Sequence, residues 1–483
     1  MVIQGGMGVG VSSWRLAQAT AKAGEKLGRP VLGVVSGAVL AVLMVNRLQD
    51  GDPGGYVRSA LEAFPVPKIA DQILDKYFHN PKRPLMSKYV LPPNPSDLVN
   101  GNPARKAEIA SLIMAANFAE VWLAKQGHSG PIGINLLEKI QLPHPWELFG
   151  AMLAGVDFVL MGAGIPSQVP AVLDKLSRME PASYKLDVTG SKEKYELSIN
   201  PSEILPQSYA KQLKRPAFLP IVASHTLAKM LATKVQGVVN GFVIEGWTAG
   251  GHNAPPRGKT QYNENGEPIY GERDIVDLDE IKALGKPFWL AGSYASSERL
   301  QEAINLGATG IQVGSIFALC DESGIRPDLK KEMRKRAFRE ELGVVTDAVA
   351  SPSGFPFQVA QLEETLSNPQ VYEARRRICS LGYLVETYQG KKGALGFRCA
   401  AEPVETYVQK GGKMEDAVGK KCLCNGLAAT VGLGEVTKLG EEPPIVTLGR
   451  SYGFIGDLIQ DEDGSYTAED ALKFLLCRNS LRD

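Results

Sequence analysis

The chain has 483 residues, of which 44% are hydrophobic and 22% are charged, so it is long enough for a large core and too apolar for a disordered protein. Its net charge is zero, so the overall charge does not favour binding to a nucleic acid or to an anionic membrane. Six irregularly spaced cysteines and no evident secretory signal predict reduced thiols and a cytoplasmic location.

Eight short apolar segments alternate with segments of helical pattern along the first two thirds of the chain. Each ends on, or is followed by, a polar residue or glycine, and each is bounded by turn-forming residues, as expected for buried strands. The predicted strands are 1–4, 31–35, 131–135, 158–161, 218–223, 241–245, 287–291 and 310–313.

Alternating strands and helices predict an α/β fold with a parallel sheet. A chain of eight βα units closes into a TIM barrel, whose active site is formed by the loops at the carboxyl ends of the strands. The competing architecture is a doubly wound open sheet, which would place its crevice at one switch point. Because polar residues and glycines follow all eight strands, the barrel accounts for more of the pattern.

Two regions do not belong to this regular alternation. Residues 48–126, after the second strand, are interpreted as a helical insertion, within which 105–125 has apolar residues at the spacing of a helix that packs one face. Residues 326–483 are interpreted as a mostly helical C-terminal extension that packs on the barrel and helps to cover its mouth or a subunit interface. The first helix is expected from Trp14, with Ser12 and Ser13 as candidate N-caps.

The sixth predicted strand leads directly into Gly250, Gly251 and His252. Glycines after a strand allow the backbone to pass close to a flat ligand or a phosphate, because no Cβ stands in the way. The histidine is then placed at the barrel mouth, although an ordinary turn with a surface histidine would give the same local sequence.

The loops after the seventh and eighth strands contain Gly292-Ser293 and Gly314-Ser315. In TIM barrels these two loops frequently bind a phosphate through backbone N–H groups. The pattern therefore predicts a phosphorylated cofactor or substrate on this side of the barrel, the alternative being two tight turns without a ligand.

Taken together, the motifs resemble those of the nitronate monooxygenases, formerly called 2-nitropropane dioxygenases. The same pattern occurs in flavin-dependent enoyl-ACP reductases and in the enoyl reductases of polyunsaturated fatty-acid synthases. The resemblance covers residues 1–325 and rests on four motifs, which are VIQGGMGV at 2–9, EGWTAGGH at 245–252, AGS at 291–293 and GIQVGSIF at 310–317.

The resemblance implies an FMN-binding TIM barrel with His252 as the catalytic residue. It further implies a set of cofactor-binding residues, namely Gly5, Gly6, Met7, Asn135, Gly162, Gly250, Gly251, Gly292, Ser293, Gly314 and Ser315. No metal is expected. The long insertion, a hairpin predicted at Asn265-Gly266 and the C-terminal extension depart from the family pattern, and they affect the expected substrate more than the cofactor.

The expected activity is oxidation of a nitronate by dioxygen to a carbonyl compound and nitrite. The alternative is an NAD(P)H-dependent reductase of an enoyl thioester or a quinone, for which an acyl carrier protein would be a partner. A rival of another class is a non-catalytic ligand-binding barrel of a synthase complex. The expected partners are small molecules, with no nucleic acid and no membrane, and a homodimer is possible.

Two further features are open to more than one interpretation. His225 follows a strand end and either faces the mouth or is a structural histidine. Cys379, Cys399, Cys422 and Cys424 would suffice for a zinc or iron–sulfur site, but their spacing matches no standard motif, so buried free thiols are expected instead.

Overall fold

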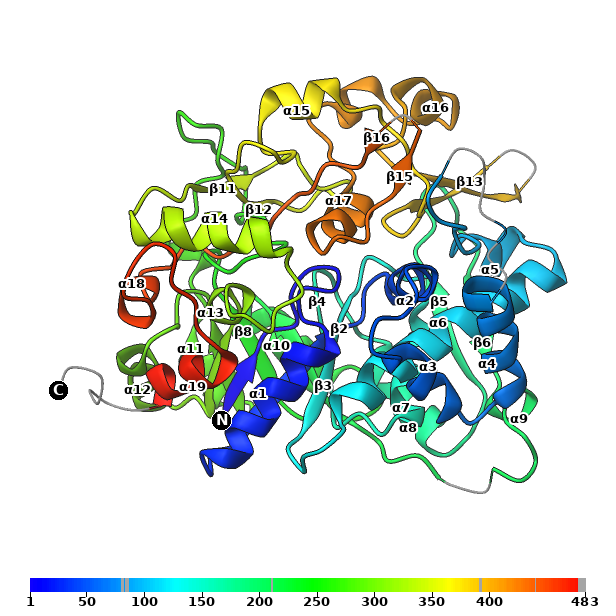
Figure 1. The fold of residues 1–483 in the computed structure, drawn as a ribbon, viewed down its shortest axis with the longest axis horizontal. Coiled ribbons are helices and arrows are strands. Elements are labelled where there is room, and N and C mark those ends of the chain that lie inside the picture. Colours follow the sequence, from blue (N-terminus) through cyan, green and yellow to red (C-terminus); the bar gives the residue numbers. More distant parts are fainter. Residues whose placement is uncertain (80–81, 83–86, 210–211, 391–392, 439, 477–483) are drawn as a thin grey trace.

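A closed barrel of eight parallel strands forms the centre of the computed structural model, which describes residues 1–483 except 80–81, 83–86, 210–211, 391–392, 439 and 477–483 (Figure 1). The strands pair in the ring order β1-β10-β9-β8-β7-β4-β3-β2. The predicted TIM barrel is thereby confirmed, as is each predicted strand. Their bounds are Val2–Gln4 (β1), Val31–Ser36 (β2), Ile132–Leu137 (β3), Phe158–Gly162 (β4), Ala217–Val222 (β7), Phe242–Glu245 (β8), Phe288–Ala291 (β9) and Gly310–Val313 (β10).

The barrel interior is filled by alternate residues of the strands, because successive side chains of a strand point to opposite faces. Ile3, Leu160, Leu219, Val243 and Trp289 belong to one buried cluster inside the ring. On β8 the same alternation turns Glu245 inward two residues after Val243. A polar side chain thus lies at the carboxyl end of an otherwise apolar interior.

Helices surround the barrel, but the last position in this ring is filled from the far end of the chain. Seven helices follow the strands in order: α1 (Trp14–Lys26), α6 (Pro103–Ala124), α7 (His144–Leu153), α8 (Val169–Ser177), α10 (His225–Thr233), α11 (Leu278–Lys282) and α12 (Ser297–Asn305). After β10 only the single turn α13 (Ser315–Ala318) follows directly.

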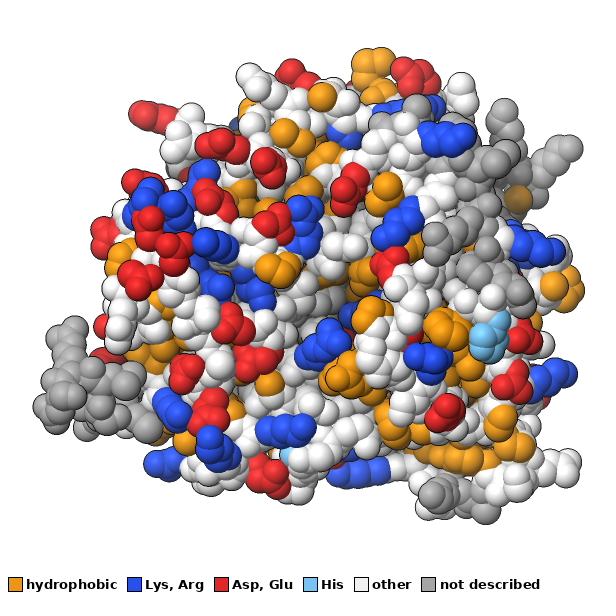
Figure 2. Space-filling model, in the orientation of Figure 1, with side chains coloured by type: hydrophobic (Ala, Val, Ile, Leu, Met, Phe, Trp, Pro, Cys, Tyr) orange, Lys and Arg blue, Asp and Glu red, His pale blue; other side chains and the backbone are white. Residues whose placement is uncertain are grey.

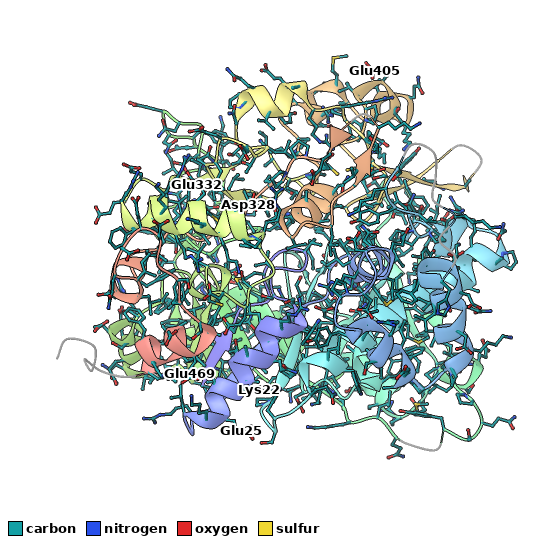
Figure 3. All side chains as sticks on the ribbon, viewed as in Figure 1. Lys22, Glu25, Asp328, Glu332, Glu405 and Glu469 are labelled. Carbon is teal, nitrogen blue, oxygen red and sulfur yellow. The ribbon has the colours of Figure 1, made fainter. Side chains whose placement is uncertain are left out.

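The remaining place between α12 and α1 is occupied by α19 (Ala468–Leu476), which packs against both of these helices (Figure 1). Lys26 of α1 forms an ion pair with Glu469 of α19 at 2.8 Å, and Figure 3 labels Glu469 on α19 beside Lys22 and Glu25 of α1. The barrel is therefore not complete within residues 1–325, because its closing helix lies in the C-terminal extension.

The start of α1 is not capped by its own serines. The Ser13 side chain makes no capping hydrogen bond, and the Trp14 N–H donates instead to Glu120 of α6 at 2.8 Å. Glu120 also pairs with Arg47 at 2.8 Å. The expected local cap is thus replaced by a buried carboxylate from a distant helix.

Helix α6 is more deeply buried than a one-faced amphipathic helix. From Ile109 onward it is buried on nearly all sides, between α7, α2, α1 and α3. Within the described residues it is the one helix long and apolar enough to cross a membrane, and most of it is buried inside the protein. Since α6 takes the second place in the helical ring, the insertion is shorter than predicted. It consists of α2 (Leu40–Gln49), α3 (Tyr56–Glu62), α4 (Pro67–Leu74), η1 (Asp75–His79) and α5 (Asp97–Asn100).

Two smaller additions interrupt the later βα units. An antiparallel hairpin of β5 (Ala182–Leu186) and β6 (Tyr195–Ile199), followed by α9 (Pro201–Ile204), lies between β4 and β7 and was not predicted. The predicted turn at Asn265-Gly266 is present, with Gly266 at a φ of 75° and the Asn263 N–H donating to the Glu267 carbonyl. The 3-10 turn η2 (Glu272–Asp274) follows it.

The C-terminal extension lies over the carboxyl ends of the strands in Figure 1 and contains less helix than expected. Three two-stranded antiparallel sheets alternate with short helices and long irregular segments. The sheets pair β11 (Val344–Asp347) with β12 (Phe357–Ala360), β13 (Glu386–Gln389) with β14 (Leu395–Arg398), and β15 (Val436–Thr437) with β16 (Gly440–Glu441). The helices are α14 (Pro327–Phe338), α15 (Pro369–Ala374), α16 (Val404–Gln409), η4 (Met414–Ala417), α17 (Leu423–Thr430) and α18 (Ile455–Leu458).

Acidic and basic side chains are interspersed over the molecular face shown in Figure 2. Many of them pair with each other, for example Arg339 of the extension with Glu462. This distribution agrees with the net charge of zero and gives this face no large field of one sign.

Candidate active site

One cavity lies at the carboxyl ends of the barrel strands, where the active sites of TIM barrels are found. The structure brings every predicted site residue to its wall, although the residues come from six of the eight strand ends. The lining includes Gly5, Gly6, Met7, Asn135, Gly162, Gly250, Gly251, His252, Gly292, Ser293, Gly314 and Ser315.

The loop after β1 is held in shape by polar side chains beneath it. Ser12 accepts a hydrogen bond from the Met7 N–H and donates one to the Gly5 carbonyl, both at 2.8 Å. Asn135 donates to the Gly6 carbonyl at 2.8 Å, and a Cβ at Gly6 would lie 2.3 Å from the Asn135 Cβ. Glycine is therefore required at position 6 by its packing against Asn135.

Hydroxyl groups gather where the loops after β8, β9 and β10 meet. Ser293, which has a positive φ of 62°, donates to Thr248 at 2.9 Å and accepts from Ser451 at 2.7 Å. Ser315 accepts from the Gly449 N–H at 2.9 Å. The two serines predicted to bind a phosphate thus lie together in the cavity wall, and each also contacts the C-terminal extension.

The C-terminal extension forms a part of the cavity wall that the sequence motifs did not predict. Thr447 accepts a hydrogen bond from the Gly251 N–H at 2.7 Å. A Cβ at Gly250 would lie 2.9 Å from the backbone nitrogen of Gly449, so this glycine makes room for the extension. Phe357, Leu384, Leu423, Cys424 and Leu427 complete the lining. Nothing in their local sequence marks these residues, since each acts through contacts with residues far away in the chain.

His252 faces the cavity and is held by two residues of the extension. Its Nε2 lies 2.7 Å from the Ser351 hydroxyl, and its ring meets the edge of Phe357 at 4.8 Å between centroids. Its remaining exposed surface borders the cavity. Burial lowers the pKa of His252 to about 4, so the imidazole is neutral at neutral pH. A neutral imidazole can accept a proton or a hydrogen bond. This favours a role as acceptor over charge stabilisation by an imidazolium.

Glu245 also lines the cavity and was not predicted as a site residue. Burial raises the pKa of Glu245 to about 8, so its carboxyl group is protonated at neutral pH. Two neighbours in the lining have buried oxygens without a hydrogen-bond donor among the described residues, namely Asn135 Oδ1 and Gln312 Oε1. The signal that could have identified Glu245 is the strand alternation that turns it inward with Val243.

His225 does not reach this cavity. It begins α10, and its Nδ1 accepts a hydrogen bond of 3.4 Å from the Asp277 N–H. The structural interpretation of His225 therefore agrees with its position.

The fold and the cavity define a TIM barrel with a ligand site at the carboxyl ends of its strands. No family model matches the chain. Among curated proteins, a probable nitronate monooxygenase of Bacillus subtilis (strain 168) is 29% identical over 131 residues, which are 27% of this chain and 36% of the relative. This match confirms the resemblance on which the site prediction rests.

A second curated protein, a succinyl-diaminopimelate desuccinylase of Alkalilimnicola ehrlichii (strain ATCC BAA-1101 / DSM 17681 / MLHE-1), is 26% identical over 130 residues, which are 26% of this chain and 34% of the relative. Among solved structures, FabK from Thermotoga maritima aligns at 15% identity and a TM-score of 0.44, over 98% of this chain and 91% of that one. The chain matches about a third of each curated relative's length, and the two names denote different activities, so neither name establishes the activity of this chain.

Proposed function

We propose that the protein is an FMN-dependent oxidoreductase that oxidises a nitronate with dioxygen to a carbonyl compound and nitrite. The observation that carries this proposal is the convergence of all twelve predicted site residues on one cavity with a neutral histidine in its wall. The partial match to a probable nitronate monooxygenase supports the choice of substrate class.

The residues present fit a flavin mononucleotide. Unpartnered oxygens of Asn135 and Gln312 offer acceptors to the polar N–H edge of a flavin ring, and buried acceptors without donors are costly unless a ligand supplies them. The glycines of the four motifs allow close approach of a flat ring. Ser293 and Ser315 would hold the phosphate. When bound, FMN would supply the transfer of electrons from the substrate to dioxygen.

The chain's own residues would bind and orient the substrate and control protons. The neutral imidazole of His252 would accept a hydrogen bond or a proton from the substrate, and the Ser351 hydroxyl fixes its orientation. Glu245 would stay uncharged and would not repel an anionic nitronate. Thr447, Leu448 and Phe357 line the cavity and would limit the access of water to a bound substrate.

The proposal is tested first by the colour of the purified protein. It should be yellow and release FMN rather than FAD on denaturation, because the predicted phosphate site accommodates one terminal phosphate and the sequence has no separate adenylate motif. A colourless protein that cannot be reconstituted with FMN contradicts the proposal.

The substrate is tested by anaerobic stopped-flow mixing. A nitronate should bleach the flavin absorbance faster than NADH or NADPH does, and admission of dioxygen should restore it. If a pyridine nucleotide is faster by a wide margin, the reductase of an enoyl thioester or quinone takes the place of the proposed activity. If neither reagent bleaches the flavin, the protein is a binder rather than a catalyst.

A further inference from the structure

One segment of the C-terminal extension, residues 447–451, lies beside the loops that are predicted to bind a phosphate. Four of its five residues line the cavity, namely Thr447, Leu448, Gly449 and Ser451. The segment belongs to no helix or strand, so its contacts with the barrel loops must fix its course.

Backbone contacts attach segment 447–451 closely to the loops after β8 and β10. The Arg450 N–H donates to the Thr248 carbonyl at 3.0 Å, and the Gly449 N–H donates to Ser315 Oγ at 2.9 Å. A Cβ at Gly449 would lie 2.9 Å from Ser315 Oγ and 3.1 Å from the Thr248 carbonyl oxygen. A side chain at position 449 would therefore push the segment away from both loops.

Three hydroxyl groups form a continuous hydrogen-bonded chain where this segment meets the barrel. Ser451 Oγ lies 2.7 Å from Ser293 Oγ, which in turn lies 2.9 Å from Thr248 Oγ1. All three residues line the cavity. Three hydroxyls carry three protons, and the two bonds between them use two, so one O–H is left to donate to a ligand. Because hydroxyl groups rotate, this free donor can stand at either end of the chain, on Thr248 or on Ser451.

Backbone N–H groups of the same loops provide further donors. Those of Gly292, Ser293, Gly314 and Ser315 donate to no acceptor among the described residues. Ser293 also has a left-handed φ of 62°, and strained backbone of this kind in non-glycine residues clusters at ligand sites. Free donors on both sides of segment 447–451 favour an anionic group with several acceptor oxygens, such as a phosphate.

Neutral groups would have to bind this phosphate. Among the described residues, no lysine or arginine lines the cavity. Arg450 lies within the segment, but its guanidinium donates to Glu267 and Thr346 instead. Ser451 is exposed to solvent, so a phosphate beside it would keep part of its hydration, and burying its charge would cost little. Each hydroxyl then accounts for a large part of the binding.

We propose that Ser451 binds the phosphate of the cofactor together with Ser293 and Ser315, so that the extension forms part of the cofactor site. The inference rests on the proposed FMN and adds to its site a residue from outside the barrel motifs. With the phosphate bound, the Ser451 O–H would donate to a phosphate oxygen, and hydrogen bonds to charged groups are stronger than neutral ones.

The test compares FMN with riboflavin, which has the same ring system and lacks the phosphate. The full chain is freed of its flavin, and each flavin is titrated into it while the quenching of flavin fluorescence is measured. Ser451→Ala should raise the Kd for FMN about tenfold, the lower end of the range for a hydrogen bond to a charged group, because the site is exposed. The Kd for riboflavin should stay unchanged.

Two further variants sharpen this comparison. Ser465→Ala removes an extension hydroxyl that bonds to Asp321 away from the cavity, so it should change neither Kd. Ser451→Asp places a carboxylate beside the phosphate, so it should weaken FMN binding more than Ser451→Ala does, while riboflavin still binds.

The outcomes separate this inference from the proposed function. If Ser451→Ala weakens FMN and riboflavin equally, the hydroxyl only shapes the wall, and the inference is overturned. Unchanged FMN affinity in Ser451→Ala overturns it as well. A wild-type protein that binds neither flavin would overturn the proposed cofactor, and this inference with it.

Discussion

The barrel and the C-terminal extension line the same cavity, but they contribute differently to it. The barrel relies on close packing of backbone against backbone, and a Cβ at Gly33 would lie 2.2 Å from the Ala17 carbonyl oxygen. The extension shares the hydrophobic core of the barrel helices and adds hydrogen bonds between distant segments, such as Ser351 with His252 and Thr447 with Gly251. The barrel therefore sets where the site residues lie, and the extension sets how deeply they are buried.

The different contributions of the barrel and the extension determine the protonation state of His252. The barrel places the imidazole at the end of β8, whereas Phe357 and Ser351 of the extension cover it. Burial is what lowers its pKa to about 4. The same barrel with an open mouth would hold a histidine of ordinary pKa, so the extension determines the protonation state in which the residue works.

The largest expected effect on the rate of flavin reduction comes from a residue of the barrel, His252. His252→Ala should retain fold and FMN but slow anaerobic flavin reduction by about 10² to 10⁴-fold, the contribution typical of a positioned acid or base. Stopped-flow absorbance measures the rate. His225→Ala is the matched control, since His225 lies outside the cavity. A wild-type rate in the His252 variant, or a slower rate in the control, would remove His252 from the proposed mechanism.

A second prediction concerns the helix that the extension contributes to the barrel. Leu472 of α19 is fully buried, so Leu472→Ala should lower the free energy of unfolding by about 2 to 5 kcal/mol. Leu219→Ala, inside the barrel, is the comparison. Urea unfolding should show a single transition in both variants if α19 is part of the barrel's cooperative unit. A separate early transition in Leu472→Ala alone would show that the extension unfolds by itself.

The regions that these two variants probe differ in how well the sequence predicts their structure. The eight strands could be predicted because short apolar runs followed by glycine or polar residues are local signals, and the twelve site residues were predicted from the family resemblance. The eighth helix could not, since α19 lies more than 150 residues after β10 and its pattern does not say which surface it covers.

A third prediction uses the pH dependence of Glu245. Its pKa is raised from 4.5 to about 8, so the carboxyl is neutral below about pH 8 and ionised above it. A negative charge beside a flavin opposes its reduction, so the reduction rate should fall as pH rises through about 8, by up to about tenfold per pH unit. The neutral form also favours folding, and this contribution to stability is lost between pH 4.5 and about 8.

Glu245→Gln replaces the protonated carboxyl by a neutral amide of similar shape. The variant should keep the wild-type reduction rate at pH 7 and lose the decline above pH 8, which a pH series of stopped-flow traces would reveal. An unchanged decline in the variant would assign the titration to another group.

The smallest expected effect lies on the extension side, at Ser351. Ser351→Ala removes the hydrogen bond of 2.7 Å to His252 Nε2, and a neutral hydrogen bond contributes about 0.5 to 1.5 kcal/mol. Flavin reduction should therefore slow by about two- to tenfold, with no change in FMN content. The hydroxyl orients the imidazole ring and does not touch the substrate. Its removal should therefore also shift the acidic limb of the plot of reduction rate against pH, which lies near pH 4. Ser465→Ala is the control, since it breaks an extension contact of similar length to Asp321 away from the cavity. A slower reduction rate together with a shifted acidic limb would mean that the extension positions the imidazole as well as covering it. Equal rates and pH profiles in wild type and Ser351→Ala would mean that the extension only covers His252.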